Sequence, residues 1–299
     1  DTVHPSTLSV MHELGLLDDF LKQPHNKAHR LKGMVGGRLI TIADFSRLNV
    51  PAPYIAMMPQ WNFLNFLASH AKQYPGFHLR MQAEADGLIE ENGKVAGVTV
   101  NTPEGPFTVR CDLVVGADGR HSTVREKAGL VVRDKGVPID VLWMRLSAKP
   151  SDPADSMGVF LPGKIMALIH RGDYWQCAYV IPKGQAAALQ KQDIAEFRAR
   201  VEAAVPFFKG RAQELKSWDD VKLLTVKIDC LERWWRPGLL CIGDAAHAMS
   251  PVGGVGINLA VQDAVAAANL LARPLKEKNL APEHLAAVQA RREPPARTT

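Results

Sequence analysis

The sequence lacks the patterns that mark several classes of protein. It contains only four cysteines, Cys111, Cys177, Cys230 and Cys241, and they form no CxxC pair and no zinc-finger spacing. A disulfide scaffold is therefore excluded, and a reduced, cytoplasmic chain is expected. The ten histidines show no HExxH or similar ligand spacing, so no metal site is predicted.

Long runs of one residue type are also missing. No stretch of about 18 uninterrupted apolar residues occurs, so no membrane span is predicted. The net charge of +5 is scattered and forms no long run of one sign, which excludes an obvious nucleic-acid or anionic-lipid partner. At most, this charge favours an anionic small ligand. Ser122 and Ser250 stand outside any GxSxG motif, so a hydrolase of that type is excluded.

The composition is that of an ordinary globular protein. Apolar residues make up 46% and charged residues 22%, which argues against disorder. At about 150 residues per domain, 299 residues suggest two domains. The chain begins with Asp1, and its tail, residues 293–299, shows no stop signal. We therefore expect that it is cut from a longer protein.

Apolar periodicity predicts alternating helices and strands. Helices are expected at residues 5–21, 61–74, 194–205 and 256–272. Strands are expected at residues 39–42, 95–100, 107–110, 113–115, 141–146, 165–170, 174–181 and 239–242. The short apolar run at 113–115 suits a parallel strand buried on both faces. The pattern predicts an α/β domain (1–28, 58–128 and 231–299) interleaved with a β-rich domain (29–57 and 129–230).

The first motif is DGRHSTVR, residues 118–125, which follows the apolar run at 113–115. An acid, a glycine, a serine and an arginine stand on a strand-to-helix turn. Such a turn gathers backbone N–H groups that suit a phosphate, and Arg125 can add charge-assisted hydrogen bonds. The alternative is an ordinary turn in which Asp118 caps the helix. Both interpretations stay open from the sequence.

The second motif is GDAAHAMSPVGGVGIN, residues 243–258. A strand ends at Gly243, and Asp244 stands at its carboxyl end, where ligands bind in open α/β sheets. A carboxylate there can accept hydrogen bonds from sugar-like hydroxyls. The glycines that follow permit close approach to a flat ligand, and the next helix directs its positive end at that ligand.

These two motifs, in this order and about 125 residues apart, resemble those of the para-hydroxybenzoate hydroxylase family of FAD-dependent aromatic monooxygenases. The resemblance implies an FAD-binding α/β domain interleaved with a β-rich substrate domain. It implies a flavoprotein oxidoreductase that hydroxylates a small aromatic substrate with NAD(P)H and O₂ through a flavin C4a-hydroperoxide. FAD and NADPH or NADH are the cofactors it implies.

The same resemblance assigns cofactor contacts to Gln60, Asp118, Arg125, Gly243, Asp244, Gly254, Gly256, Ile257 and Asn258. Gln60 would touch the flavin linker, Asp118 would lie near the pyrophosphate, and Asp244 would bond the ribityl chain. The backbone at 256–258 would meet the flavin pyrimidine edge. Arg125 would assist NAD(P)H binding.

For the substrate, the resemblance places Pro251 beside the reacting carbon and the β-rich sheet over the ring. Five polar or aromatic residues lie on the expected hairpins, and a core or surface role is favoured for each: His170, Arg171, Tyr174, Trp175 and Tyr179. His247 is interpreted as a packed, hydrogen-bonded residue rather than a catalytic base.

One departure from the family concerns its N-terminal GxGxxG unit. Gly33, Gly36 and Gly37 do not have that spacing, so the ADP half of the FAD site is expected to be absent from this chain. The alternatives are a flavin-dependent reductase or halogenase on the same scaffold, or a truncated, non-catalytic fragment. A halogenase is expected to place a lysine near the ring, and no such lysine can be identified. The sequence leaves a homodimer open.

Overall fold

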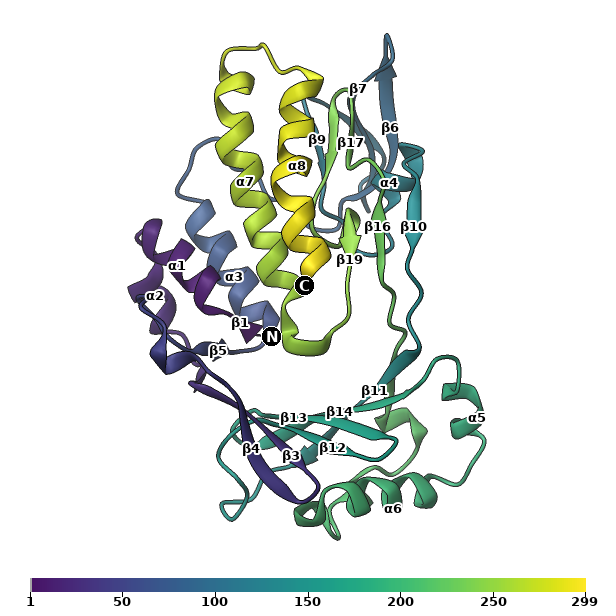
Figure 1. Ribbon diagram of the computed structural model, residues 1–299. Coiled ribbons are helices and arrows are strands. Elements are labelled where there is room, and N and C mark those ends of the chain that lie inside the picture. The colour runs from purple at the N-terminus through teal and green to yellow at the C-terminus, as the bar shows by residue number, and fades with distance from the viewer. Residues whose placement is uncertain (1) are drawn as a thin grey trace. The chain divides into compact units, whose positions relative to one another are not determined.

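The chain folds into two compact units, each built from two separate segments (Figure 1). A computed structural model describes residues 2–299, and Asp1 lies outside the described residues. Unit 1 comprises the residues up to Phe63 together with Val137–Val226, and unit 2 comprises Leu64–Gly136 together with Lys227–Thr299. Unit 1 thus joins residues 2–28 to the β-rich segments. The functional division into an FAD-binding and a substrate domain stays a prediction.

Unit 1 is built on a seven-stranded sheet with the order β15-β11-β14-β13-β12-β3-β4. The strands are β3 (Arg30–Val35), β4 (Arg38–Asp44), β11 (Ile139–Ser147), β12 (Met157–Leu161), β13 (Lys164–His170), β14 (Tyr174–Pro182) and β15 (Lys222–Leu224). Only β12 and β3 pair in parallel, and the other neighbours are antiparallel. The predicted hairpin strands are confirmed, whereas β3, β12 and β15 were not predicted.

One face of this sheet forms the core of unit 1. Alternate side chains such as Leu142, Met166 and Tyr179 point inward and are buried. Helix α6 (Ile194–Ala204) lies across that face (Figure 1), and Phe197 meets Tyr179 edge to face with ring centroids 5.4 Å apart. Trp175 is fully buried in the same core. The core role favoured for Trp175 and Tyr179 is confirmed.

The N-terminal part of unit 1 holds two helices where the sequence predicted one. α1 (Pro5–Glu13) and α2 (Leu17–Leu21) are separated at Gly15, where the backbone is left-handed with φ +69°. A glycine in this conformation ends a helix, so the single helix expected at 5–21 was wrong. A small sheet of order β1-β5-β2 completes this part, with β1 Thr2–Val3, β2 Asn26–Ala28 and β5 Ile55–Met57.

Unit 2 contains three short sheets. Their orders are β17-β18-β9, β6-β7-β8 and β10-β16-β19. The strands are β6 (Glu84–Glu91), β7 (Lys94–Asn101), β8 (Phe107–Arg110), β9 (Val114–Gly116), β10 (Val132–Asp134), β16 (Asp229–Leu231), β17 (Trp235–Arg236), β18 (Leu239–Cys241) and β19 (His247–Ala248). β18 and β9 pair in parallel, which confirms the parallel strand predicted near 113–115. The expected burial on both faces was wrong, because Val115 is 45% exposed. Five strands of this unit were not predicted, namely β6, β10, β16, β17 and β19.

Two long helices lie side by side in unit 2, α7 (Gly256–Lys276) and α8 (Pro282–Thr298) (Figure 1). α7 was predicted to end four residues earlier, and α8 was not predicted. By length and composition Val252–Lys276 could cross a membrane, the one such helix among residues 2–299. Of the apolar window in this helix, 33% is buried, and the buried residues of α7 include Leu259, Asp263 and Leu271.

A buried ion pair closes the end of the unit 1 core. The guanidinium of Arg211 binds the carboxylate of Asp152 through two contacts of 2.5 and 2.6 Å, and the indole N–H of Trp175 donates to the same carboxylate over 2.8 Å. Burial alone would raise the pKa of Asp152. The hydrogen bonds from Arg211, from the Lys149 N–H and from Trp175 outweigh burial and lower that pKa to about 2.

We expect Asp152→Asn to reduce the free energy of unfolding at pH 7 by about 3–5 kcal/mol, because it leaves Arg211 buried without its counter-charge. The depressed pKa makes this stabilisation fully present above pH about 4 and lost as the pH falls toward about 2. Urea unfolding between pH 2 and pH 7 would therefore show that the free energy of unfolding depends less on pH in the variant than in the wild type over that window.

Asp173→Asn is the matched control, because the side chain of Asp173 is 80% exposed and its ion pair with Arg145 spans 3.5 Å. An exposed pair of this kind contributes about 0–1 kcal/mol. Equal losses of stability in the two variants would contradict the role assigned to the buried pair.

Candidate functional site

The two sequence motifs follow neighbouring parallel strands of unit 2. In the pairing of β9 with β18, Gly116 lies opposite Cys241, and the N–H of Ile242 donates to the Gly116 carbonyl over 2.9 Å. The carboxyl ends of neighbouring parallel strands meet at one edge of a sheet, so the turns that follow lie together. Arg120 of the first motif lies 3.7 Å from Asp244 of the second, Nη2 to Oδ2. The structure thus brings the two motifs into one site.

Asp244 lies in η5 (Gly243–Ala245), a short 3-10 turn directly after β18. Its side chain is 32% exposed, and its carboxylate accepts no hydrogen bond among residues 2–299, where Arg120 is its one ion-pair partner. An ideal Cβ on Gly256 would lie 3.9 Å from Oδ1 of Asp244, so the carboxylate faces the start of α7. Burial raises the pKa of Asp244, and the charges of Arg120 and His247 oppose this rise. The carboxylate therefore has open acceptor positions for the hydroxyls of a ligand.

The start of α7 is open as well. The helix begins after Val255 without a side-chain cap, and the preceding residues Gly253 and Gly254 are left-handed with φ +79° and +61°. The side-chain amide of Asn258 donates to the Gly254 carbonyl over 3.1 Å and holds this turn in place. An uncapped helix start directs N–H groups and the positive end of the helix dipole at whatever lies before it. This arrangement suits a polar or anionic group.

Asp118 closes the turn before α4 (Thr123–Lys127). Its carboxylate accepts from the hydroxyl of Ser122 over 2.5 Å and from the N–H of Val124 over 3.0 Å. Ser122 is itself the N-cap and accepts from the N–H of Arg125. The structure thus shows the helix-capping role that the sequence left open. The expected place of Asp118 near a pyrophosphate stays a prediction.

Arg125 is buried, with 6% of its side chain exposed, and it pairs with the fully buried Asp229 at 3.2 Å. Its guanidinium also donates to the backbone carbonyls of Ala245, over 3.4 Å, and of Arg120. A buried arginine with this set of partners holds backbone segments together. The NAD(P)H contact expected for Arg125 stays a prediction.

The remaining predicted residues, Gln60 and Pro251, lie at or next to the start of a helix. Gln60 is exposed and belongs to unit 1; it is the first residue of α3 (Gln60–Ala71), a helix that continues into unit 2 from Leu64. Pro251 is half-buried and immediately precedes η6 (Val252–Gly254) in unit 2. Neither position tests the role that the resemblance assigns.

Three charged residues of the site were not predicted: Asp229, Asp263 and Arg292. Asp263 is completely buried and binds Nε2 of His247 over 2.6 Å, and the His247 ring also packs on Trp234 with centroids 4.8 Å apart. The packed, hydrogen-bonded role favoured for His247 is confirmed. An acid within the apolar stripe of an alanine-rich helix was the signal that could have revealed Asp263.

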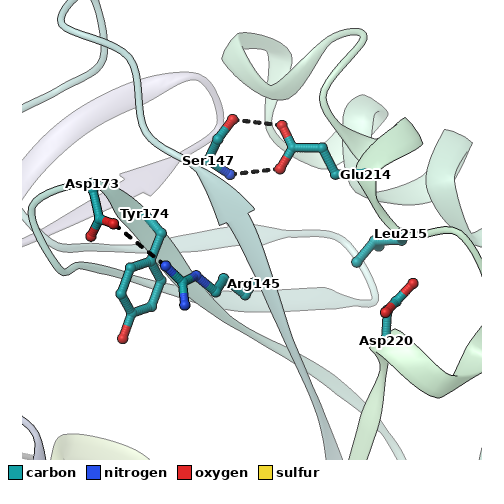
Figure 2. A pocket seen from close by; sticks show the side chains of 7 residues that line it. All are labelled: Arg145, Ser147, Asp173, Tyr174, Glu214, Leu215 and Asp220. Carbon is teal, nitrogen blue, oxygen red and sulfur yellow. Dashed lines mark hydrogen bonds and ion pairs between the residues drawn. The ribbon is translucent and has the colours of Figure 1, made fainter.

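A separate pocket of about 350 Å³ lies in unit 1 (Figure 2). Its polar groups already bind one another. Glu214 accepts from the N–H and the hydroxyl of Ser147, and Arg145 stacks on the ring of Tyr174 at 3.7 Å and pairs with Asp173. Tyr174 lines this pocket, but neither Pro251 nor any residue assigned to the cofactor does, so it is not the site that the motifs mark.

The family model for the FAD binding domain matches residues 1–299. The chain belongs to this family. A 6-methylpretetramide 4-monooxygenase of Streptomyces rimosus is 35% identical over 298 residues, which cover 98% of this chain and 71% of the relative. A para-nitrophenol 4-monooxygenase of Pseudomonas sp. (strain WBC-3) is 24% identical over 280 residues, which cover 91% of this chain and 68% of the relative.

The fold of this FAD binding domain is also found in a solved structure. The crystal structure of PqsL, a probable FAD-dependent monooxygenase from Pseudomonas aeruginosa, superposes with a TM-score of 0.82 at 21% identity and covers 100% of this chain and 82% of that chain. The predicted fold class is confirmed. The chain is an oxidoreductase of the FAD-dependent aromatic monooxygenase family, with FAD as cofactor and a small molecule as substrate.

We expect Asp244→Asn to raise the melting temperature of the FAD-free protein at pH 7 by a few degrees. The raised pKa of Asp244 means that the fold disfavours its charged form. This cost is present above the raised pKa and vanishes as the pH falls below the ordinary aspartate pKa. Calorimetry across pH should therefore show the two proteins converging in acid.

Glu104→Gln, in the exposed turn between β7 and β8, removes the same charge from unit 2 and serves as control. If the Asp244→Asn protein melts below both the wild type and this control at pH 7, burial does not destabilise the charged carboxylate of Asp244, and the prediction is contradicted.

Proposed function

We propose that the edge formed by η5 and the start of α7 holds the flavin of FAD in an enzyme that hydroxylates an aromatic ring. The observation that carries this proposal is the half-buried carboxylate of Asp244, which has open acceptor positions and faces Gly256. Ribityl hydroxyls would donate to Asp244. The N–H groups of Gly256 and Ile257, at the uncapped start of α7, would meet the pyrimidine edge.

The local shape fits a flat group. The left-handed glycine pair before α7 carries no side chain that could block approach. An ideal Cβ on Gly243 would lie 3.0 Å from the Cβ of Ala260, so Gly243 brings η5 close against α7. The amide of Asn258 is committed to Gly254 and so shapes the turn. These residues form a cradle made of backbone.

Bound FAD would supply the redox and oxygen chemistry, with NAD(P)H as reductant. The chain's own contribution is to bind, orient and stabilise charge. The positive end of α7 would favour a negative charge that develops on the reduced ring. Gln60 would touch the flavin linker, Asp118 would lie near the pyrophosphate, and Pro251 would border the substrate.

The open face of the unit 1 sheet is the proposed surface for the aromatic substrate. It carries exposed apolar side chains from β4, β12 and β13, namely Ile40 at 47%, Ile42 at 54%, Phe160 at 37% and Ile165 at 45% exposure. An ideal Cβ on Gly158 would lie 2.6 Å from Cε2 of Phe160, so the Phe160 ring lies over this glycine. A flat apolar surface of this kind suits an aromatic ring. Relatives named for 6-methylpretetramide and para-nitrophenol support this class of substrate.

For the setting of the protein we propose the cytoplasm, without nucleic acid or a membrane as partner and with a homodimer left open. The four cysteines are free. The apolar helix α7 carries the fully buried carboxylate of Asp263, which is ion-paired with Arg292 and His247. These features support α7 as a core helix.

We expect Asp244→Ala in the full-length protein to weaken FAD binding by about 10–150-fold, because a hydrogen bond to a charged group contributes about 1.5–3 kcal/mol. Quenching of flavin fluorescence would give the dissociation constant, and the melting temperature of the same sample would report stability. Glu104→Gln again serves as control. A variant that holds FAD as tightly as the wild type would exclude the proposed contact.

We expect Phe160→Ala to raise the KM for the aromatic substrate by about 10-fold through lost apolar contact, while FAD affinity stays unchanged. Substrate-stimulated NAD(P)H oxidation and incorporation of ¹⁸O from O₂ would be measured with a fused-ring phenol and with para-nitrophenol. Leu39→Ala is the control, because Leu39 is 52% exposed and alternates with Ile40 onto the other face of β4. Product that contains halide instead of ¹⁸O would favour the halogenase alternative.

A further inference from the structure

The turn that carries Asp244 is held at both ends by buried charged side chains. On one side, the N–H of Gly243 donates to Oδ2 of Asp263 over 3.0 Å. On the other side, the carbonyl of Ala245 accepts from Nη1 of Arg125 over 3.4 Å. The two contacts flank Asp244 directly. No other residue within η5 has a side chain that could anchor the turn, since the others are glycine and alanine.

Asp263, the first of these two anchors, binds several other residues of unit 2. Its side chain is fully buried, and Oδ1 accepts from Nε of Arg292 on α8 over 2.7 Å. Its Oδ2 is shared between Gly243 and His247. Burial would raise the pKa of Asp263, but the hydrogen bond and charge of His247, followed by Arg292, lower it. Asp263 is therefore a carboxylate that links α7, α8 and η5.

The Arg125 anchor reaches η5 from α4. Asp229, which lies on β16 and is fully buried, accepts from both terminal nitrogens of Arg125 over 3.2 and 3.3 Å. Lys227 lies 3.1 Å from the same carboxylate. Arg125 also binds the Arg120 carbonyl, so it joins the first motif to the second. The two anchors thus approach η5 from different elements.

We propose that Asp263 and Arg125 are positioning residues that fix Asp244 in the orientation in which it binds the flavin. The inference rests on the proposed function of Asp244. Buried ion pairs are weak stabilisers, because desolvation offsets most of their attraction. In addition to their ion pairs, Asp263 and Arg125 each form a hydrogen bond with a backbone atom next to Asp244. Outer residues that orient a ligand-binding group often affect binding strongly without touching the ligand.

The test is a double-mutant cycle on FAD affinity in the full-length protein. Asp263→Asn keeps an oxygen acceptor but cannot serve Gly243, His247 and Arg292 as the carboxylate does. We expect it to weaken FAD binding by about 10-fold, a part of the effect of losing the Asp244 contact itself. In the Asp244→Ala background, Asp263→Asn should change FAD affinity by less than about twofold, because the two residues act through one contact.

Asp152→Asn is the matched control, because it breaks a comparably buried ion pair in unit 1. It should lower the melting temperature while FAD affinity stays within about twofold of the wild type. Additive effects of Asp244→Ala and Asp263→Asn would overturn the proposal, as would unchanged FAD affinity in Asp263→Asn. If Asp244→Ala itself leaves FAD affinity unchanged, the proposed function fails first, and the two failures are thereby distinguished.

Arg125→Lys carries the same test from the other end of the turn if Asp263→Asn does not fold. A lysine keeps the charge opposite Asp229 but lacks the fork that also reaches Ala245. We expect weaker FAD binding and a changed visible circular dichroism of the bound flavin, again without further loss in the Asp244→Ala background. An Arg125→Lys protein with wild-type FAD affinity and an unchanged flavin spectrum would overturn the role of this anchor.

Discussion

The parallel pairing of β9 with β18 is the constraint on which the site depends. Each strand has three residues, and the N–H of Ile242 continues the ladder by donating to Gly116. This pairing aligns two strands that lie far apart in sequence, so the turns that follow them begin at the same edge of the sheet. The turns that carry Asp118 and Asp244 therefore lie at the same edge, where Arg125 also binds backbone carbonyls of both motifs. Elsewhere in unit 2, Asp263 of α7 and Arg125 of α4 bind the backbone of the turn that carries Asp244.

Three aspartates around this edge have different environments. Asp118 accepts two hydrogen bonds, one from a hydroxyl and one from a backbone N–H group of its own turn. Asp263 is fully buried and binds the Arg292 guanidinium, the His247 ring and the Gly243 N–H group. Asp244 is half-buried and has open acceptor positions. One residue type thus has three roles here: Asp118 caps a helix, Asp263 anchors a turn and Asp244 presents a binding group. The number of donors around each carboxylate decides which role it has.

The motifs and the hairpin strands could be predicted from the sequence because their signals are local. The apolar run before Asp118 predicts a strand within a few residues. The glycines after Asp244 predict the turn that precedes the next helix. The break at Gly15 was missed because apolar spacing continues across it. α8 was missed because its apolar stripe is weak and Pro294 and Pro295 lie near its end. The partners Asp229 and Arg292 could not be found, because long-range packing alone brings them to the site.

The interleaving of the two units has a consequence for the order in which the chain can fold as it is synthesised. Unit 1 has all its residues once Val226 has been made, whereas β9 must wait for β18, which lies beyond that point. During this interval β9 presents an unpaired apolar edge, which is a hazard for aggregation. Pairing between strands so distant in sequence is also slow. The proposed binding of the flavin at this edge therefore requires that β18 has been synthesised and has paired with β9.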